Sequence, residues 1–364
     1  MSSSTAAANV LIYRLGSLGD TVIALPCFHK IREHYPNATI TLLTNRPVAH
    51  KAAPIEAVLG EGYFFDQILA YPIGTRNPFL IVEIIRKIRS LSITTVINIT
   101  AARSLMSIER DKWFFRAAGV RELIGFPDKP EDVTLFCEPS TGEFEWEAKR
   151  LARRLAPIGM PDLTNDSNWN LRLTLSEYSQ ADNFLRGVAG NTPLLAISAG
   201  TKMQAKDWGE SNWQALIKKL GAYLPDWTLV MLGASDERDL SERCLQCWPG
   251  TSINLCGQPS PRVSAVVLQK ARLFVGHDSG PMHLAACVGT PCVAIFSARN
   301  LPRQWYPRGD SNKILYTPTD CAGCGLEVCI KEKKKCISSI SVDQVFQSIV
   351  SILGGKMNET KSSV

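Results

Sequence analysis

The sequence predicts an α/β protein of two Rossmann-like domains, whose parallel sheets face each other across a cleft. Three observations predict this fold. The 364 residues suffice for two domains of ordinary size. Apolar strand-like runs alternate with helical patterns, as in βαβ units and parallel sheets. A polar, irregular stretch over residues 161–191 divides this pattern into two halves.

The first half opens with a strand over residues 10–14, a turn over 16–20, a helix to about 35 and a strand over 38–44. Further strands are predicted over 64–70, 94–99 and 122–125, and helices over 78–91, 105–118 and 143–155. We expect this domain to span residues 9–172, after a disordered tail over 1–8. A linker should follow over 173–191.

The second half repeats the pattern. Its strands are predicted over 194–198, 228–232, 252–255, 273–276 and 292–296, and its helices over 211–224, from about 236, over 261–271 and from Pro281. This domain should span residues 192–340. A C-terminal helix over 341–354 and a disordered tail over 355–364 complete the chain.

Composition excludes several classes of protein. No run of about 18 apolar residues predicts a transmembrane helix. The start, MSSSTAAAN, lacks the basic and apolar regions of a signal peptide, so we expect a cytoplasmic protein. The net charge is +6, but no nucleic-acid-binding module is recognisable, so nucleic acid is not an expected partner.

The positive charge is concentrated in residues 76–121. Nine lysines and arginines there face three acidic residues, so this segment carries a net charge of +6. Solvated helix faces would explain this concentration of positive charge. A surface for an anionic partner, such as a phosphorylated lipid or glycan, would explain it equally well. We assign four of these side chains to the binding of such a partner: Arg103, Arg110, Lys112 and Arg116.

The stretch FVGHDSGPMHLAACVGTPCVAIF, residues 274–296, is the most informative motif. It predicts a strand, a polar turn, a helix with Pro281 at its first position, and a second strand. The helix N-terminus is then an anion site at the carboxyl edge of the sheet. Because Asp278 suits hydroxyl groups better than phosphate, the motif favours a ligand with both phosphate and sugar character.

Two further turns carry candidate residues. In the first half, Gly16, Ser17 and Gly19 precede Asp20, which is either a helix cap or a general base at the cleft. In the second half, Thr201, Lys202 and Lys206 follow a strand and could meet a diphosphate.

Eleven cysteines without a signal peptide argue against a disulfide scaffold. Four of them lie within sixteen residues: Cys321, Cys324, Cys329 and Cys336. Four thiolates could bind a structural zinc or another soft metal, while disulfides and free thiols remain open.

The chain resembles glycosyltransferase family 9, the bacterial lipopolysaccharide heptosyltransferases, over roughly residues 9–353. The resemblance is carried by LGSLGD (15–20), AGTKMQAKDWGESNW (199–213), LGASDE (232–237) and GHDSGPMHLAACVGTPCVAIF (276–296). It implies a GT-B fold and inverting transfer from a nucleotide-diphospho-sugar, without a metal or another catalytic cofactor. This chain departs from the family at one place: after the strand over 292–296 the family has a Gly-Pro-Thr-like stretch, whereas this chain has Ser-Ala-Arg-Asn at 297–300.

The resemblance also implies roles for individual residues. Asp20 matches the catalytic base, Lys206 the lysine on the donor diphosphate, and Glu237 the acid that holds the nucleoside ribose. The residues that match the donor phosphate and sugar site are Asp278, Ser279, Gly280, Met282 and His283.

The implied reaction is transfer of heptose from ADP-heptose to a lipopolysaccharide core or a related bacterial surface glycan. The implied acceptor is an anionic glycolipid or glycan at the cytoplasmic face of the inner membrane, which the enzyme would contact peripherally. Two alternatives remain. One is another GT-B nucleotide-sugar enzyme, such as an epimerase or a transferase with a different donor. The other is a non-catalytic sugar-nucleotide-binding protein.

Overall fold

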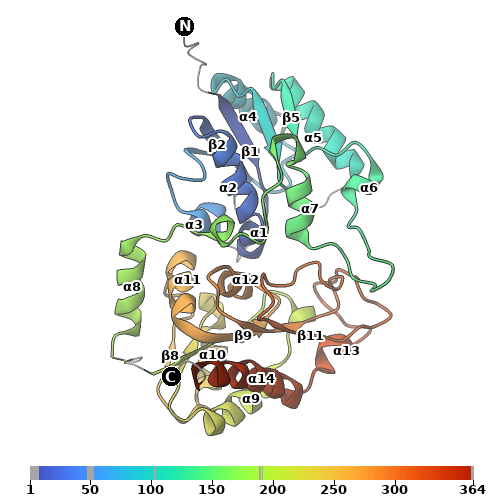
Figure 1. Cartoon of the computed structure of the whole chain (residues 1–364). Coiled ribbons are helices and arrows are strands. Elements are labelled where there is room, and N and C mark those ends of the chain that lie inside the picture. Colours follow the sequence, from blue (N-terminus) through green and yellow to red (C-terminus); the bar gives the residue numbers. More distant parts are fainter. Residues whose placement is uncertain (1–7, 47–52, 102–103, 188–189, 191, 362–364) are drawn as a thin grey trace. The chain divides into compact units, whose positions relative to one another are not determined.

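The chain divides into two compact units, Met1–Asn170 and Leu171–Val364, each with its own parallel sheet (Figure 1). The computed structural model describes residues 8–46, 53–101, 104–187, 190 and 192–361. Of the two tails predicted to be disordered, residues 1–7 and 362–364 lie outside this range. No helix within the described ranges combines the length and apolar character needed to cross a membrane.

Unit 1 has a five-stranded sheet in the order β3-β2-β1-β4-β5, and every adjacent pair is parallel. Its strands are β1 (Asn9–Tyr13), β2 (Thr39–Asn45), β3 (Gln67–Tyr71), β4 (Thr95–Asn98) and β5 (Glu122–Ile124). Its helices are α1 (Leu18–Ile23), α2 (Leu25–His34), α3 (Ile55–Leu59), α4 (Pro78–Ser90), α5 (Leu105–Ala117), α6 (Pro130–Val133) and α7 (Glu147–Arg153), with short 3-10 turns η1 (Ala156–Ile158) and η2 (Asp166–Trp169).

Helices α4 and α5 cover one face of this sheet. Asn77 caps α4, because its side chain accepts the Phe79 N–H at 3.0 Å. Ile84 and Ile88 of α4 are buried in the same core as Phe115 of α5. Helices α2 and α7 contact each other and lie over the opposite face (Figure 1).

Unit 2 has a six-stranded sheet in the order β11-β10-β9-β6-β7-β8, again with parallel pairs. Its strands are β6 (Leu194–Ser198), β7 (Thr228–Met231), β8 (Ser252–Asn254), β9 (Ala271–His277), β10 (Cys292–Phe296) and β11 (Lys313–Tyr316). Its helices are α8 (Leu175–Leu185), α9 (Glu210–Tyr223), α10 (Arg238–Leu245), α11 (Pro261–Lys270), α12 (Gly280–Cys287), α13 (Lys335–Ser338) and α14 (Val342–Lys361), with 3-10 turns η3 (Gln204–Lys206) and η4 (Ser235–Glu237).

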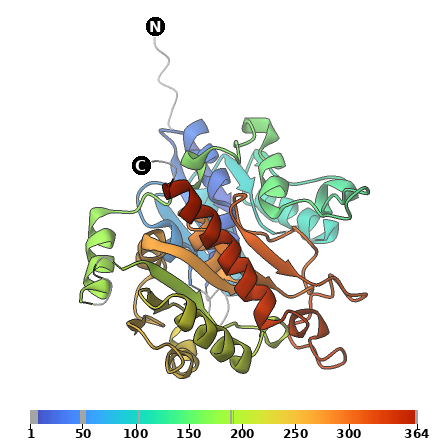
Figure 2. The same ribbon diagram turned by 60° about the horizontal axis from the view of Figure 1, so that its bottom comes forward.

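The core of unit 2 follows the period of its strands. Alternate residues such as Ile197, Val275 and Ile295 are fully buried beneath α9 and α14. Figure 2 shows α14 lying across this part of the unit, where it contacts α9, β10 and β11. The predicted C-terminal helix is therefore an integral part of unit 2.

Three predicted boundaries were wrong. The helix expected to run to about residue 35 is broken at Ala24, because Pro26 lacks the N–H group that would continue the first helix. A second helix begins at Leu25, with Pro26 in its first turn. The expected linker over 173–191 contains α8, which is stabilised by a capping interaction between Thr174 and Glu177. Helix α14 continues to Lys361, past the predicted end at 354, so residues 355–361 of the expected disordered tail are helical.

Candidate functional site

Two loops of unit 2 meet where the strand order of its sheet changes direction. Strand β6 lies between β9 and β7, and Ser198 at its end is paired with Gly276 of β9. The loop after β6 carries Lys206, and the loop after β9 carries Asp278. Ligands of open α/β sheets bind at such switch points, outside the carboxyl ends of the strands.

Lys206 and Asp278 form a largely buried ion pair at this edge. The Lys206 ammonium donates to the Asp278 carbonyl oxygen at 2.8 Å and lies 2.9 Å from its Oδ2. The same Oδ2 accepts a hydrogen bond from the Asn300 amide at 2.6 Å. The two side chains are only 14% and 5% exposed, so their charges compensate each other in the protein without ligand.

The N-terminus of α12 lies next to this pair. Ser279 is the N-cap, and its buried hydroxyl oxygen has no hydrogen-bond partner within the described part of the chain. The free N–H groups and positive dipole end of an eight-residue helix therefore adjoin Lys206. The helix begins at Gly280, so Pro281 occupies the second position instead of the predicted first. Met282 and His283 are buried within α12, 0% and 4% exposed.

His277 holds the two loops together, a role that the sequence did not predict. Its Nε2 accepts the Trp208 N–H at 3.1 Å, so Nδ1 carries the proton and donates to the Gly200 carbonyl oxygen at 3.2 Å. Burial lowers the pKa of the His277 imidazole to about 4, so the ring is neutral near pH 7. A neutral ring can accept and donate at once, which fixes the loop that carries Lys206.

Glu237 packs against the loop that follows β6. Its Oε2 accepts the Ala234 N–H at 2.8 Å. A Cβ atom at Gly200 would lie 2.2 Å from the Glu237 carboxyl carbon, and one at Gly233 would lie 2.4 Å from its Oε2. The glycines are thus required for the close approach of this carboxylate.

The remaining predicted donor residues lie on the same loop. The Thr201 hydroxyl oxygen accepts a long hydrogen bond of 3.4 Å from the Met203 N–H, and the Lys202 side chain is exposed. Unit 2 therefore brings Lys206, Glu237, Asp278 and Ser279 to one edge of its sheet, with Lys202 at the periphery.

In unit 1, Asp20 occupies the turn after β1. Its Oδ2 accepts hydrogen bonds from the Ser17 N–H and hydroxyl, both at 2.7 Å, while the side chain remains 24% exposed. Helix α1 begins at Leu18, so Ser17 is the N-cap and Asp20 is the third helical residue, where a carboxylate caps the turn reciprocally. Gly16 has φ of +132°, and a Cβ atom there would lie 2.6 Å from the Asp20 Cβ.

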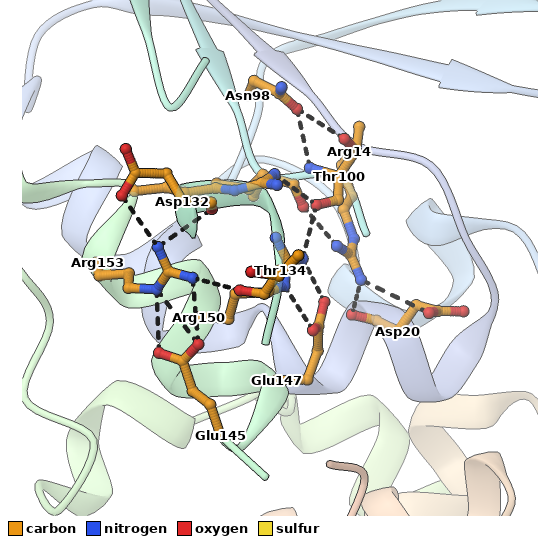
Figure 3. A network of polar contacts seen from close by, with 12 residues as sticks. Arg14, Asp20, Asn98, Thr100, Asp132, Thr134, Glu145, Glu147, Arg150 and Arg153 are labelled. Carbon is orange, nitrogen blue, oxygen red and sulfur yellow. Dashed lines mark hydrogen bonds and ion pairs between the residues drawn. The ribbon is translucent and has the colours of Figure 1, made fainter. Parts of the chain in front are cut away.

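Arg14 connects the Asp20 turn to the rest of unit 1 (Figure 3). Its fully buried guanidinium donates to the carbonyl oxygens of Asp20 and Ile99, and its Nη2 lies 4.0 Å from Asp20 Oδ1. Burial lowers the pKa of Arg14 below its usual value. Because an arginine at a strand end has no distinctive local pattern, the sequence did not single it out.

Two more buried arginines lie behind Arg14. Arg150 pairs with Glu147 and donates to the Thr100 carbonyl oxygen at 3.0 Å, which also accepts from Arg154 at 2.8 Å (Figure 3). Burial lowers the pKa of Arg154 to about 9. The guanidinium groups tie α7 to the strand ends that support the Asp20 turn.

A family model described as glycosyltransferase family 9 (heptosyltransferase) matches residues 147–335, more than half of the chain. The chain belongs to glycosyltransferase family 9. The lipopolysaccharide core heptosyltransferase OpsX of Haemophilus influenzae is 20% identical over 322 residues, which are 84% of each chain.

Solved structures confirm the GT-B fold class of this family 9 glycosyltransferase. The family 9 enzyme from Veillonella parvula has a TM-score of 0.72 at 17% identity, covering 97% of this chain and 99% of its own. The Escherichia coli heptosyltransferase WaaC, solved with ADP-2-deoxy-2-fluoro heptose, has a TM-score of 0.58 at 15% identity, covering 94% and 99%.

The predicted acceptor residues of this glycosyltransferase differ in their surroundings. Arg103 lies outside the described residues. Arg110 is exposed and donates to Asp111 at 2.8 Å. Lys112 is bonded to Glu109 and Asp128, and its side chain is only 17% exposed. Arg116 donates to backbone carbonyl oxygens at the end of α5. Lys112 and Arg116 therefore stabilise unit 1 through contacts within it.

The cysteine segment of the glycosyltransferase, residues 320–336, packs against the loop after β6 and the loop after β10. The Ala205 N–H donates to the Glu327 carbonyl oxygen at 3.0 Å, and the Cys329 N–H donates to the Gln204 side chain at 2.8 Å. The Arg299 guanidinium, next to Asn300, donates to the carbonyl oxygens of residues 325 and 326. The segment thus supports the positions of both Lys206 and Asn300.

The predicted zinc site at these cysteines is not formed. Among the described residues, no group of three or more histidine, cysteine, aspartate or glutamate side chains could hold a metal ion. Cys329 and Cys336 are buried, whereas Cys324 is exposed, and all four are free thiols. One structural neighbour, the E. coli glycosyltransferase TibC, is iron-containing; it has a TM-score of 0.51 at 16% identity, covering 96% of this chain and 77% of its own.

Proposed function

We propose that this enzyme transfers heptose from ADP-heptose to a lipopolysaccharide core or a related bacterial surface glycan. The observation that carries the proposal is the Lys206–Asp278 pair beside the α12 N-terminus, in a family 9 chain whose relatives include OpsX and WaaC. The positive groups suit the diphosphate of the donor. Glu237 and Asp278 supply acceptors for its hydroxyl groups.

The proposed chemistry is a single displacement with inversion. The Asp20 carboxylate takes the proton of the acceptor hydroxyl while that oxygen attacks the anomeric carbon. The bond between this carbon and the diphosphate oxygen breaks, and ADP leaves with the electron pair. Lys206 and the α12 N-terminus stabilise the charge that develops on the diphosphate, through donors that are already in place.

The direct test is incubation with ADP-heptose and a lipopolysaccharide core acceptor. We expect release of ADP together with a mass increase of one heptose on the acceptor. UDP- and GDP-sugars serve as control donors. Conversion of a nucleotide-sugar without any acceptor would favour an epimerase, tight binding without turnover would favour a binding protein, and either result would overturn the proposal.

Catalysis should need no divalent cation, because Lys206 and the α12 N-terminus supply positive charge at the leaving diphosphate. We expect equal initial rates in EDTA and in added magnesium. Loss of activity in EDTA that magnesium or manganese restores would contradict this. Metal analysis of the enzyme before and after chelation is the control that no bound ion remains during the assay.

We further propose that the enzyme acts at the cytoplasmic face of the inner membrane, where the basic segment of unit 1 attracts an anionic acceptor. Arg76, Arg86 and Arg110 are exposed and suit this role better than Lys112 and Arg116. Each exposed arginine near an anionic membrane contributes about 1 kcal/mol.

Reversing Arg76, Arg86 and Arg110 to glutamate should weaken binding to anionic vesicles on the order of 10²-fold and raise the apparent Michaelis constant for the acceptor. Sedimentation with vesicles at two salt concentrations measures this, since salt screens exposed charges. The matched control reverses Lys218, Arg272 and Lys313, which are exposed in unit 2. Equal vesicle binding by the two triple variants would refute the role of the basic segment.

A further inference from the structure

Unit 1 contains a cavity of about 630 Å³ that no step of the proposed reaction uses. It lies at the carboxyl ends of β1, β2 and β3, between α4 and α5. Its size is in the range of small-molecule sites. Most of its lining is apolar, including Leu15, Leu43, Ile81, Ile85 and Phe114.

Besides Asn45 and Thr75, whose hydroxyl donates to the Pro72 carbonyl oxygen, the polar groups of the lining are engaged with each other. The hydroxyl groups of Tyr13 and Tyr71 are hydrogen-bonded at 3.1 Å, and Arg110 is paired with Asp111. A sugar needs several convergent donors and acceptors, because each buried hydroxyl without a partner is unfavourable. The interior of this cavity therefore suits a hydrocarbon group better than a glycan.

The mouth of the cavity has a different character from its interior. The lining residues Ile73 and Trp113 are 54% and 74% exposed, so the cavity reaches the surface. Exposed apolar side chains continue along the same two helices, where Phe79 and Met106 are 84% and 83% exposed. The Arg110 side chain, which also lines the cavity, is 67% exposed.

Cations also lie on the helices that border the cavity, since α4 carries the exposed Arg86 and Lys87. Such a surface matches the boundary of an anionic membrane, where aromatic and aliphatic side chains enter the acyl region and basic side chains contact headgroups. A large exposed apolar surface on a globular unit indicates an interaction site of this kind.

We propose that this cavity binds one acyl chain of an anionic membrane lipid, with the headgroup at Arg110. That this lipid is the glycolipid acceptor rests on the proposed function. The binding of an acyl chain is independent of the proposed function, because it follows from the apolar lining of the cavity, its charged mouth and its exposed rim. Bound in this way, the lipid would be held to unit 1 while its sugar remains accessible.

The test is calorimetric titration of the full chain with alkyl phosphates of increasing chain length, kept below their micelle-forming concentrations. Affinity should rise about three- to fourfold for each added methylene until the cavity is full. The heat capacity change should be negative, as expected when apolar surface is buried. Inorganic phosphate and glycerol phosphate, which lack a chain, should bind at least 10²-fold more weakly than dodecyl phosphate.

A pair of neighbouring substitutions on α4 locates the site. Ile81 lines the cavity, whereas Val82 beside it is exposed and does not. Ile81→Trp should fill the cavity and abolish the dependence on chain length, whereas Val82→Trp should retain it. Thermal unfolding and ADP-heptose affinity of both variants show whether the fold and unit 2 are intact. If Ile81→Trp unfolds, the smaller change Ile81→Phe replaces it.

Affinity that is independent of chain length, or an equal response of the two variants, would overturn the proposal. A soluble acceptor glycan without acyl chains would also overturn it if this glycan displaced dodecyl phosphate from the parent protein and Ile81→Trp abolished the displacement. That result would identify the cavity as a sugar site. The titration contains no donor, so failure of heptose transfer leaves its result unaffected, and a failed titration leaves the proposed transferase activity intact.

Discussion

Replacement of Asp20 by asparagine should lower the turnover number by about 10²-fold or more, while the fold and the donor affinity remain unchanged. Asparagine keeps a side-chain oxygen that can accept the Ser17 N–H, which Asp20 now accepts at 2.7 Å. The capping of the turn is thereby preserved, and the ability to take a proton is lost. The measurements are steady-state rates, ADP-heptose binding and thermal unfolding of the variant.

Ser17→Ala separates the two interpretations of Asp20. It removes the hydroxyl that donates to Asp20 at 2.7 Å but leaves the carboxylate and the backbone hydrogen bond in place. If Asp20 is the base, Ser17→Ala should retain most of the activity. Near-normal turnover of Asp20→Asn would rule out the role of Asp20 as the base. A parallel loss of stability and activity in both variants would show that Asp20 only caps the helix.

Those parts of the site that depend on local pattern could be predicted from the sequence. The strand, turn and helix that present Asp278 and Ser279 follow from an apolar run, a glycine and a proline within a few residues. The turn before Asp20 was recognised in the same way. The cap at Ser17 was displaced from the predicted position, because the boundary of a helix is set by hydrogen bonds that pattern does not show.

The partners of these residues could not be predicted, because they come from distant parts of the chain. Asn300 reaches Asp278 only because β9 and β10 are neighbours, and His277 reaches Gly200 only because β9 pairs with β6. Nothing in the local pattern distinguishes Arg14 from an ordinary strand residue. The contacts of the cysteine segment with Gln204 and Arg299 likewise depend on tertiary structure.

These partners change how the role of Lys206 must be tested. Lys206→Ala should weaken ADP-heptose binding and slow transfer together, by about 10²–10³-fold in kcat/KM, because it removes a cation placed for the diphosphate. It also leaves the Asp278 carboxylate, 5% exposed, without the cation that compensates its charge and with the hydrogen bond from Asn300, and an uncompensated buried charge is itself destabilising. A loss of affinity in the single variant therefore has two possible causes.

The double variant Lys206→Ala/Asp278→Asn distinguishes them, because it removes both charges of the buried pair. If Lys206 contacts the diphosphate, thermal stability should recover in the double variant while donor affinity remains low. If Lys206 only neutralises Asp278, stability and donor affinity should recover together, and the diphosphate assignment is wrong. Lys202→Ala, which removes an exposed lysine of the same loop, is the control for a general loss of positive charge and should change donor affinity less than Lys206→Ala. Together with the two single variants, the double variant completes a double-mutant cycle, which gives the coupling between Lys206 and Asp278 in donor binding. This coupling measures how far the donor affinity depends on rearranging an ion pair that is already present before the donor binds.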